Sequence, residues 1–243
     1  MRTAGLLVMM FFGAIGCGGM SSPPHPKIIL FNGAGTSPNS VKAVGEILIR
    51  LRLPYVTLDS QDLNQLKPSE FESFRLVIVP GGNYIEMGNS LSPNTTAAIR
   101  EAVHGGLNYL GICAGGLLAG NADCNSLNLT SGVKFGFYAD VNRNIHKAVV
   151  RVSFVDEPTQ EFYWEDGPQF EGWGDVVGKY ADGTPAVVQG RSMKGKALLV
   201  GVHPEAPDNW RNGMVFETPT QVNNAFAARL ISSALEGSEL PHY

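Results

Sequence analysis

The chain of 243 residues is 44% hydrophobic and 16% charged, which suits one globular domain or two small ones and excludes disorder and a coiled coil. The formal net charge is −4, and no run of basic residues occurs. Such a chain lacks the electrostatic footprint of nucleic-acid-binding proteins, so we expect no DNA or RNA partner.

The N-terminus has the features of an export signal. Residues 4–12 form an apolar stretch that is too short to span a bilayer but suits the hydrophobic region of a secretory signal. The stretch leads into Ala14-Ile15-Gly16-Cys17, which resembles the lipobox of bacterial lipoproteins. The resemblance implies that residues 1–16 are a signal peptide and that acyl chains on Cys17 anchor the protein in the bacterial cell envelope, facing the periplasm or the exterior. The alternatives are an ordinary signal peptide and a buried N-terminal helix.

Residues 17–26 are rich in Gly, Ser and Pro and are expected to form a flexible tether after the lipidated cysteine. Short apolar runs then alternate with helical patterns through the first half of the chain. The expected strands are residues 27–31, 55–58, 75–79 and 108–112, and the expected helices are residues 41–51, capped by Ser40, and residues 97–103. Strands separated by helices form right-handed crossovers, so we expect an α/β fold with a parallel sheet.

The second half of the chain has a different pattern. Residues 148–155, 186–189 and 197–202 are expected strands, with turn sequences such as Asp182-Gly183 and Lys194-Gly195 between them. This arrangement predicts hairpins. A final helix is expected over residues 222–235. No internal repeat or linker follows the tether, so residues 27–243 are interpreted as one domain.

A possible nucleophile lies where the fourth strand meets a helix. Gly111-Ile112-Cys113-Ala114-Gly115 has the pattern of a nucleophile elbow with Cys in place of Ser. The glycines allow a tight strand-to-helix turn, and the start of a helix favours a thiolate over a thiol. A buried cysteine on a glycine-rich turn is the alternative, because the pattern is short.

A base and an orienting carboxylate could come from Val202-His203-Pro204-Glu205. In an extended chain, residues i and i+2 face the same side, so His203 and Glu205 could point together. Pro204 cannot donate to a sheet ladder and predicts the exposed end of a strand. His203 would hold the proton of Cys113 and Glu205 would orient the imidazole. A plain turn after a strand is the alternative for this motif.

A glycine loop follows the third strand. The backbone of Pro80-Gly81-Gly82-Asn83 could approach a substrate closely, so the amides of Gly81 and Gly82, together with that of Ala114, are candidates for an oxyanion hole. Taken alone, the loop would be interpreted as structural. With Cys113 and the His-Pro-Glu motif, it fits an acyl-transfer site at the strand ends.

These motifs resemble the class I glutamine amidotransferase-like superfamily, in which an elbow cysteine pairs with a late His-x-Glu. The closer resemblance is to the biotin-protein ligase N-terminal domain family, through residues 32–37, 79–82 and 105–116. It implies a flavodoxin-like three-layer α/β/α sandwich with a mainly parallel sheet and with Cys113, His203 and Glu205 in the catalytic places. Biotin ligation is not implied, because the sequence shows no matching biotin-binding motif.

The segment from residue 161 to residue 173 mixes aromatic, acidic and glycine residues. It could line a pocket or cover the sheet. No spacing of ligand-type residues indicates a metal, and no cofactor is expected. Cys113 and Cys124 could form one disulfide or stay free in an oxidising compartment.

The sequence favours a lipid-anchored, amidotransferase-like cysteine hydrolase that acts on a small-molecule or peptide substrate. The alternative is a non-catalytic envelope module that binds a ligand or an assembly partner with the same fold. A third hypothesis is a redox function through a reversible disulfide between Cys113 and Cys124.

Overall fold

The computed structural model describes residues 27–139 and 143–243. The expected signal peptide, the lipidated Cys17 and the tether lie outside these residues. Within the described ranges, none of the helices has the length and apolar character needed to cross a membrane.

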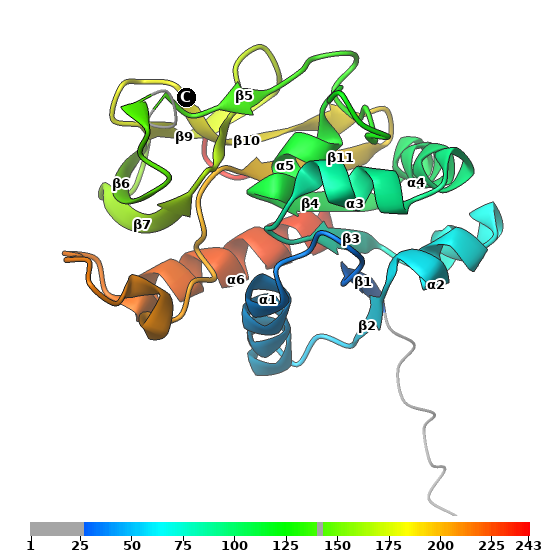
Figure 1. The fold of residues 1–243 in the computed structure, drawn as a ribbon, viewed down its shortest axis with the longest axis horizontal. Coiled ribbons are helices and arrows are strands. Elements are labelled where there is room, and N and C mark those ends of the chain that lie inside the picture. The colour runs from blue at the N-terminus through cyan, green and yellow to red at the C-terminus, as the bar shows by residue number, and fades with distance from the viewer. Residues whose placement is uncertain (1–26, 140–142) are drawn as a thin grey trace, which may run out of the picture.

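One twisted sheet runs through the described chain (Figure 1). Its strand order is β2-β1-β3-β4-β11-β10-β9-β6-β7. The strands are β1 (Ile28–Phe31), β2 (Tyr55–Leu58), β3 (Leu76–Val79), β4 (Asn108–Ile112), β6 (Lys147–Phe154), β7 (Gln160–Glu165), β9 (Asp175–Tyr180), β10 (Pro185–Ser192) and β11 (Gly195–Val200). A separate small ladder pairs β5 (Gly136–Phe137) with β8 (Pro168–Gln169).

The sheet has a parallel part and an antiparallel part. Strands β2, β1, β3, β4 and β11 pair in parallel, as the alternation of strands and helices predicts. From β11 outward, β10, β9, β6 and β7 pair antiparallel, and the expected turns at Asp182-Gly183 and Lys194-Gly195 join consecutive strands. The predicted α/β fold class is confirmed, and the antiparallel hairpins expected in the second half of the chain extend one side of the sheet.

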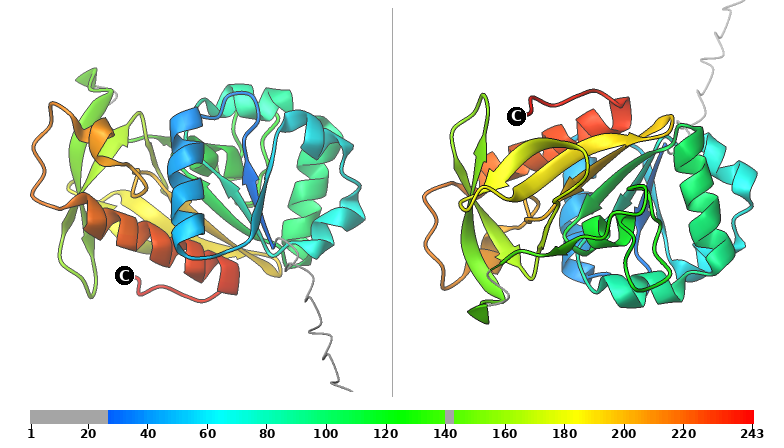
Figure 2. Two further views of the ribbon diagram at one scale, coloured as in Figure 1. Left: turned by 90° about the horizontal axis from the view of Figure 1, so that it is seen from below. Right: turned by 90° about the horizontal axis from the view of Figure 1, so that it is seen from above.

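Helices cover both faces and complete three layers. They are α1 (Pro38–Arg50), α2 (Ser60–Gln65), α3 (Tyr84–Ser90), α4 (Pro93–Gly105), α5 (Ala114–Ala119) and α6 (Thr220–Glu236), with short 3₁₀ helices at Pro68–Ser73 and Asp208–Arg211. Helices α1 and α6 pack on one face, and α3, α4 and α5 pack on the other (Figures 1 and 2). Helices α1, α4 and α6 bury apolar side chains against the sheet and α5 is buried on all sides, and this burial is the main favourable term for the fold.

The start of α1 differs from the prediction. Ser37, not Ser40, is the N-cap, and its side chain accepts from the backbone amide of Ser40. Pro38 occupies the first helical turn, where its missing N–H is not needed. The helix therefore begins earlier than expected, and Ser40 becomes a helical residue whose side chain is fully buried.

The sequence analysis missed two strands of the main sheet, β7 and β9, and both strands of the small ladder, β5 and β8. In β7, Phe162 and Trp164 enter one hydrophobic core, while Tyr163 and Glu165 on the opposite side line a cavity. Both faces therefore carry large side chains, which hides the usual polar and apolar alternation. The parallel strands end on the edge of the sheet where ligands bind in open α/β folds.

Candidate functional site

Cys113 lies at a strained turn between β4 and α5. Its backbone has φ 51° and ψ −110°, a conformation that non-glycine residues rarely adopt outside functional sites. The turn is tight because a Cβ at Gly115 would lie 2.1 Å from the carbonyl oxygen of Val79, and one at Gly111 would lie 2.5 Å from that of Gly115. The glycines that the elbow pattern contains are therefore sterically required.

His203 and Glu205 lie in a turn beyond β11, and the turn is buried. Their exposed fractions are 6% and 2%. The motif follows the end of a strand as predicted, but the prediction that this end is exposed is wrong. The turn brings the two side chains together: Nδ1 of His203 is 2.9 Å from Oε1 of Glu205. The backbone amide of His203 donates to the carbonyl of Tyr163 at 2.9 Å, which ties the turn to β7.

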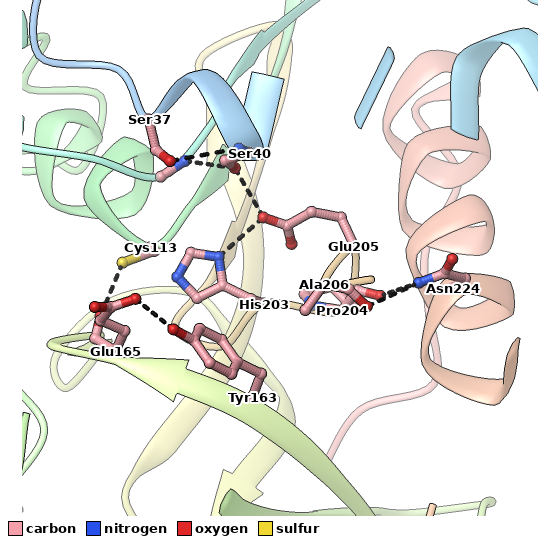
Figure 3. Close-up of polar contacts among 11 residues, drawn as sticks. Ser37, Ser40, Cys113, Tyr163, Glu165, His203, Pro204, Glu205, Ala206 and Asn224 are labelled. Atoms are coloured by element: carbon pink, nitrogen blue, oxygen red, sulfur yellow. Dashed lines mark hydrogen bonds and ion pairs between the residues drawn. The ribbon is translucent and has the colours of Figure 1, made fainter. Parts of the chain in front are cut away.

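Electrostatics favour a protonated His203. Burial lowers the pKa of this imidazole, but the charges of Glu205 and of Cys113, with hydrogen bonds to both, raise it more strongly. The resulting pKa is well above the ordinary value for histidine. Figure 3 shows the ring nitrogen that does not contact Glu205 on the side of Cys113. The arrangement places a protonated imidazole between the Cys113 sulfur and the buried Glu205 carboxylate.

Ser40 is a further member of this cluster, and the sequence analysis interpreted it only as a helix cap. Its Oγ lies 2.8 Å from Oε1 of Glu205, to which it donates. The backbone amide of Gly81 donates to the same Oγ at 3.1 Å. No local sequence signal identifies this role, because it depends on how α1 packs against two loops that are distant in sequence.

The glycine loop after β3 lies against the imidazole. A Cβ at Gly81 would lie 2.6 Å from Cε1 of His203. The amide of Gly81 is already engaged by Ser40, which leaves Gly82 and Ala114 as the candidate oxyanion donors. Both line the same cavity as Cys113 and His203, and Ala114 is the first residue of α5, where an amide has no acceptor within the helix.

Strands β6 and β7 supply the opposite wall of this cavity. The Cys113 thiol lies 3.5 Å from the carbonyl oxygen of Glu165, and Figure 3 marks this contact with a dashed line. The Glu165 carboxylate accepts from the Tyr163 hydroxyl at 2.5 Å and lies 3.3 Å from the ammonium group of Lys147. Burial and the hydrogen bond to Glu165 raise the pKa of Tyr163 to about 12. This hydroxyl therefore stays protonated at neutral pH and keeps Glu165 in place.

The cavity has a volume of about 900 Å³, large enough for a ligand of drug-like size. Its walls combine aromatic rings, aliphatic side chains, uncharged polar groups, one ammonium and the carboxylates of Glu165 and Asp166. Trp210 lies beside the imidazole, with 5.6 Å between the ring centroids of Trp210 and His203. The lining includes Ser37, Asn39, Gly82, Asn83, Tyr84, Cys113, Ala114, Phe137, Lys147, Tyr163, Glu165, His203, Asn209 and Trp210.

The aromatic segment expected either to line a pocket or to cover the sheet does both. Tyr163, Glu165 and Asp166 line the cavity, whereas Trp164 and Phe170 are fully buried in the two cores. Residues alternate between the two faces of a strand, so one segment serves both purposes.

Cys113 and Cys124 are free thiols in the described part of the chain. Cys124 is half-buried, and its thiol lies 3.7 Å from the carbonyl oxygen of Tyr84. Burial and the neighbouring Asp123 raise the pKa of the Cys124 thiol. Over residues 27–139 and 143–243, no group of three or more His, Cys, Asp or Glu side chains is arranged to hold a metal ion.

Part of the chain is similar to a known protein family. Residues 26–133 match the family model described as "Biotin-protein ligase, N terminal". The resemblance predicted from the sequence is thereby confirmed. The biotin-protein ligase N-terminal match contains Ser40, the glycine loop and Cys113, and it ends before His203 and Glu205. No curated protein matches the chain.

Solved structures share the fold over most of the chain. A glutamine amidotransferase from Thermotoga maritima has a TM-score of 0.61 at 14% identity, covering 88% of this chain and 100% of that one. A second glutamine amidotransferase has a TM-score of 0.55 at 19% identity, covering 74% and 90%. The chain therefore has a glutamine amidotransferase-like, flavodoxin-like α/β fold.

The same fold occurs within a larger enzyme of another kind. An exo-β-1,4-mannosidase from Opitutaceae bacterium strain TAV5 has a TM-score of 0.55 at 15% identity, covering 85% of this chain and 36% of the mannosidase. A fold shared by such different proteins does not determine the reaction, so function has to be argued from the site.

Proposed function

We propose that the protein is a cysteine-dependent amide hydrolase with Cys113 as nucleophile, His203 as general base and acid, and Glu205 as the carboxylate that orients the imidazole. One observation carries this proposal. His203 is buried with Nδ1 2.9 Å from the Glu205 carboxylate, and its raised pKa depends on Cys113 as well as on Glu205. An imidazole held in this way can take the thiol proton and keep the thiolate ready for attack.

In the first half of the proposed reaction, the Cys113 thiolate attacks the carbonyl carbon of an amide. The carbonyl oxygen becomes an oxyanion, and the amides of Gly82 and Ala114 donate to it. His203 then gives its proton to the nitrogen, so the C–N bond breaks and the amine leaves. The products of this half are a free amine and an acyl group bound to Cys113 as a thioester.

In the second half, water attacks the thioester carbonyl while His203 accepts a proton from the water. The C–S bond breaks, the carboxylic acid leaves, and Cys113 recovers its thiolate with the imidazolium beside it. The overall reaction consumes one amide and one water and yields one carboxylic acid and one amine. It requires no cofactor.

The proposed substrate has groups on both sides of the scissile amide. The cavity of about 900 Å³ exceeds what a single small amino acid fills, and its walls carry both aromatic rings and side-chain amides. A peptide-like or γ-glutamyl amide offers the matching apolar surface and hydrogen-bonding groups. The exposed Lys147, whose ammonium contacts Glu165 at the cavity wall, would interact with an acidic group on such a substrate.

The proposed location is the bacterial cell envelope, with the membrane reached through acyl chains on Cys17. The small residues before Cys17 and the apolar stretch before them support this location. Intact-mass analysis of the protein extracted from membranes tests it: we expect a chain that starts at Cys17 and carries acyl groups. A chain that keeps residues 1–16, or that starts elsewhere without acylation, would contradict it.

The hydrolase proposal is tested by incubating the full chain with a panel of peptide and γ-glutamyl amides and measuring free amine. We expect release with the wild type and none with Cys113→Ser, because a serine hydroxyl does not ionise near neutral pH. Binding of a panel member without any release, by both forms, would favour the non-catalytic binding module instead.

A further inference from the structure

Ser40 makes two hydrogen bonds that join three separate parts of the fold. It lies in the first turn of α1, donates to Oε1 of Glu205 beyond β11, and accepts from the amide of Gly81 after β3. Its exposed fraction is 0%. A buried hydroxyl between a backbone amide and a carboxylate has a well-defined orientation, because buried polar groups strongly prefer to be paired.

The direction of each bond follows from counting protons. A serine hydroxyl has one proton to donate and two lone pairs to accept with. The Gly81 amide can only donate, so it takes one lone pair of Ser40 Oγ. The carboxylate of Glu205 can only accept, so it receives the single hydroxyl proton. Gly81 therefore orients the Ser40 hydroxyl toward Glu205.

Both bonds to the Glu205 carboxylate fall on the same oxygen. Oε1 is hydrogen-bonded to the Ser40 hydroxyl and to Nδ1 of His203. Oε2 is buried without a hydrogen-bond partner among the described residues. The carboxylate is thus held from two sides at one atom. Without the hydroxyl, only the His203 bond would remain to set its orientation.

We infer that Ser40 is a positioning residue for the nucleophile, acting through Glu205 and His203 and not by contact with substrate. The inference rests on the proposed function. Ser40 aims the Glu205 carboxylate at Nδ1 of His203, and its bond to Gly81 keeps the glycine loop packed against the same imidazole. One hydroxyl thus holds the base in place from the carboxylate side and from the cavity wall.

The test measures the alkylation rate of Cys113 by iodoacetamide across pH, read by peptide mass in the full-length protein. We expect Ser40→Ala to slow alkylation at pH 6 by about tenfold, the size expected for a hydrogen bond to a charged group. The loss should shrink toward alkaline pH, where the thiol ionises without help from His203. A purely structural effect of Ser40 would not depend on pH in this way.

The matched control is Ser233→Ala. Ser233 is another buried serine, on α6. Its hydroxyl donates to the carbonyl of Ser238 at 2.7 Å. We expect this variant to lose a similar amount of stability and to keep the wild-type alkylation profile. Equal profiles for Ser40→Ala and Ser233→Ala would overturn the inference while leaving the hydrolase proposal intact.

A double-mutant comparison shows whether Ser40 acts through Glu205. In a Glu205→Gln background, Ser40→Ala should cause no further loss of alkylation, and a second full loss would overturn the inference. A wild-type Cys113 whose reactivity does not depend on His203 would overturn the proposed function itself. If Ser40→Ala does not fold, Ser40→Thr and Ser40→Val replace it: they have the same shape, so equal alkylation rates would overturn the inference.

Discussion

The imidazole of His203 packs directly against the α-carbon of Gly81. A methyl group at position 81 would lie only 2.6 Å from Cε1 of His203, closer than non-bonded carbon atoms approach. This contact means that the glycine loop sets the position of the ring, while Glu205 sets its rotation. Glycine is therefore required at position 81.

We expect Gly81→Ala to displace the ring from Cys113. Displacement by about 1 Å can cost up to about a hundredfold in reactivity, so Cys113 alkylation at pH 6 should fall by at least about tenfold. The control is Gly105→Ala at the end of α4, where an added Cβ meets nothing within 4 Å. Equal alkylation rates for the two variants would show that Gly81 does not position the ring.

The raised pKa of His203 makes stability depend on pH. A group whose pKa is higher in the folded state contributes stability that is complete below its unfolded value, about 6.5 for histidine, and that is lost as pH rises through the folded value. The difference in unfolding free energy between the wild type and His203→Gln should therefore be largest below pH 6.5 and should decrease at higher pH. Urea unfolding across this range measures it.

The same pH-dependent effect of His203→Gln on the unfolding free energy should be measured in a Cys113→Ser background. The Cys113→Ser substitution removes the Cys113 sulfur, which is one of the causes that raise the pKa of His203, and leaves Glu205 in place. The stabilisation by His203 should then be lost at a lower pH than in the wild type. A difference between wild type and His203→Gln that grows with pH would mean that the pKa of His203 is lowered on folding.

Backbone strain at Cys113 predicts an unusual effect of glycine. At φ 51° and ψ −110°, a residue with a Cβ is strained by about 1–3 kcal/mol, and glycine is not. Cys113→Gly should therefore have an unfolding free energy at least about 1 kcal/mol higher than Cys113→Ala. Chemical unfolding of both variants tests this, and a less stable glycine variant would contradict strain at the elbow.

Much of this site could be predicted from sequence because it lies at strand ends with clear local patterns. The parallel strands are short apolar runs, and the glycines around Cys113 mark a turn that only small residues allow. The pairing of His203 with Glu205 was also expected, although through an extended strand. In the structure the pair forms in a buried turn instead. The pairing could still be predicted, because an extended strand and this turn both bring the side chains of residues i and i+2 together.

Other features depend on contacts between distant segments. Ser40 has the local signature of a helix cap, and only the packing of α1 against the loops at Gly81 and Glu205 gives it another role. For the segment that contains Tyr163 and Glu165, the sequence left open a pocket wall or a cover for the sheet, because β7 is buried on one face and lines the site on the other. The sequence analysis treated Gly81 as an oxyanion donor, but its amide donates to Ser40 instead.

The measurement that tests the account most directly is the pH dependence of iodoacetamide alkylation at Cys113, in wild type and in His203→Ala. Cys124 is the reference within the same molecule, because burial and Asp123 raise the pKa of its thiol. We expect wild-type Cys113 to react rapidly below pH 7 while Cys124 does not, and to lose this reactivity in His203→Ala. Slow alkylation of Cys113 that follows the same pH profile as Cys124, with or without His203, would contradict an activated nucleophile.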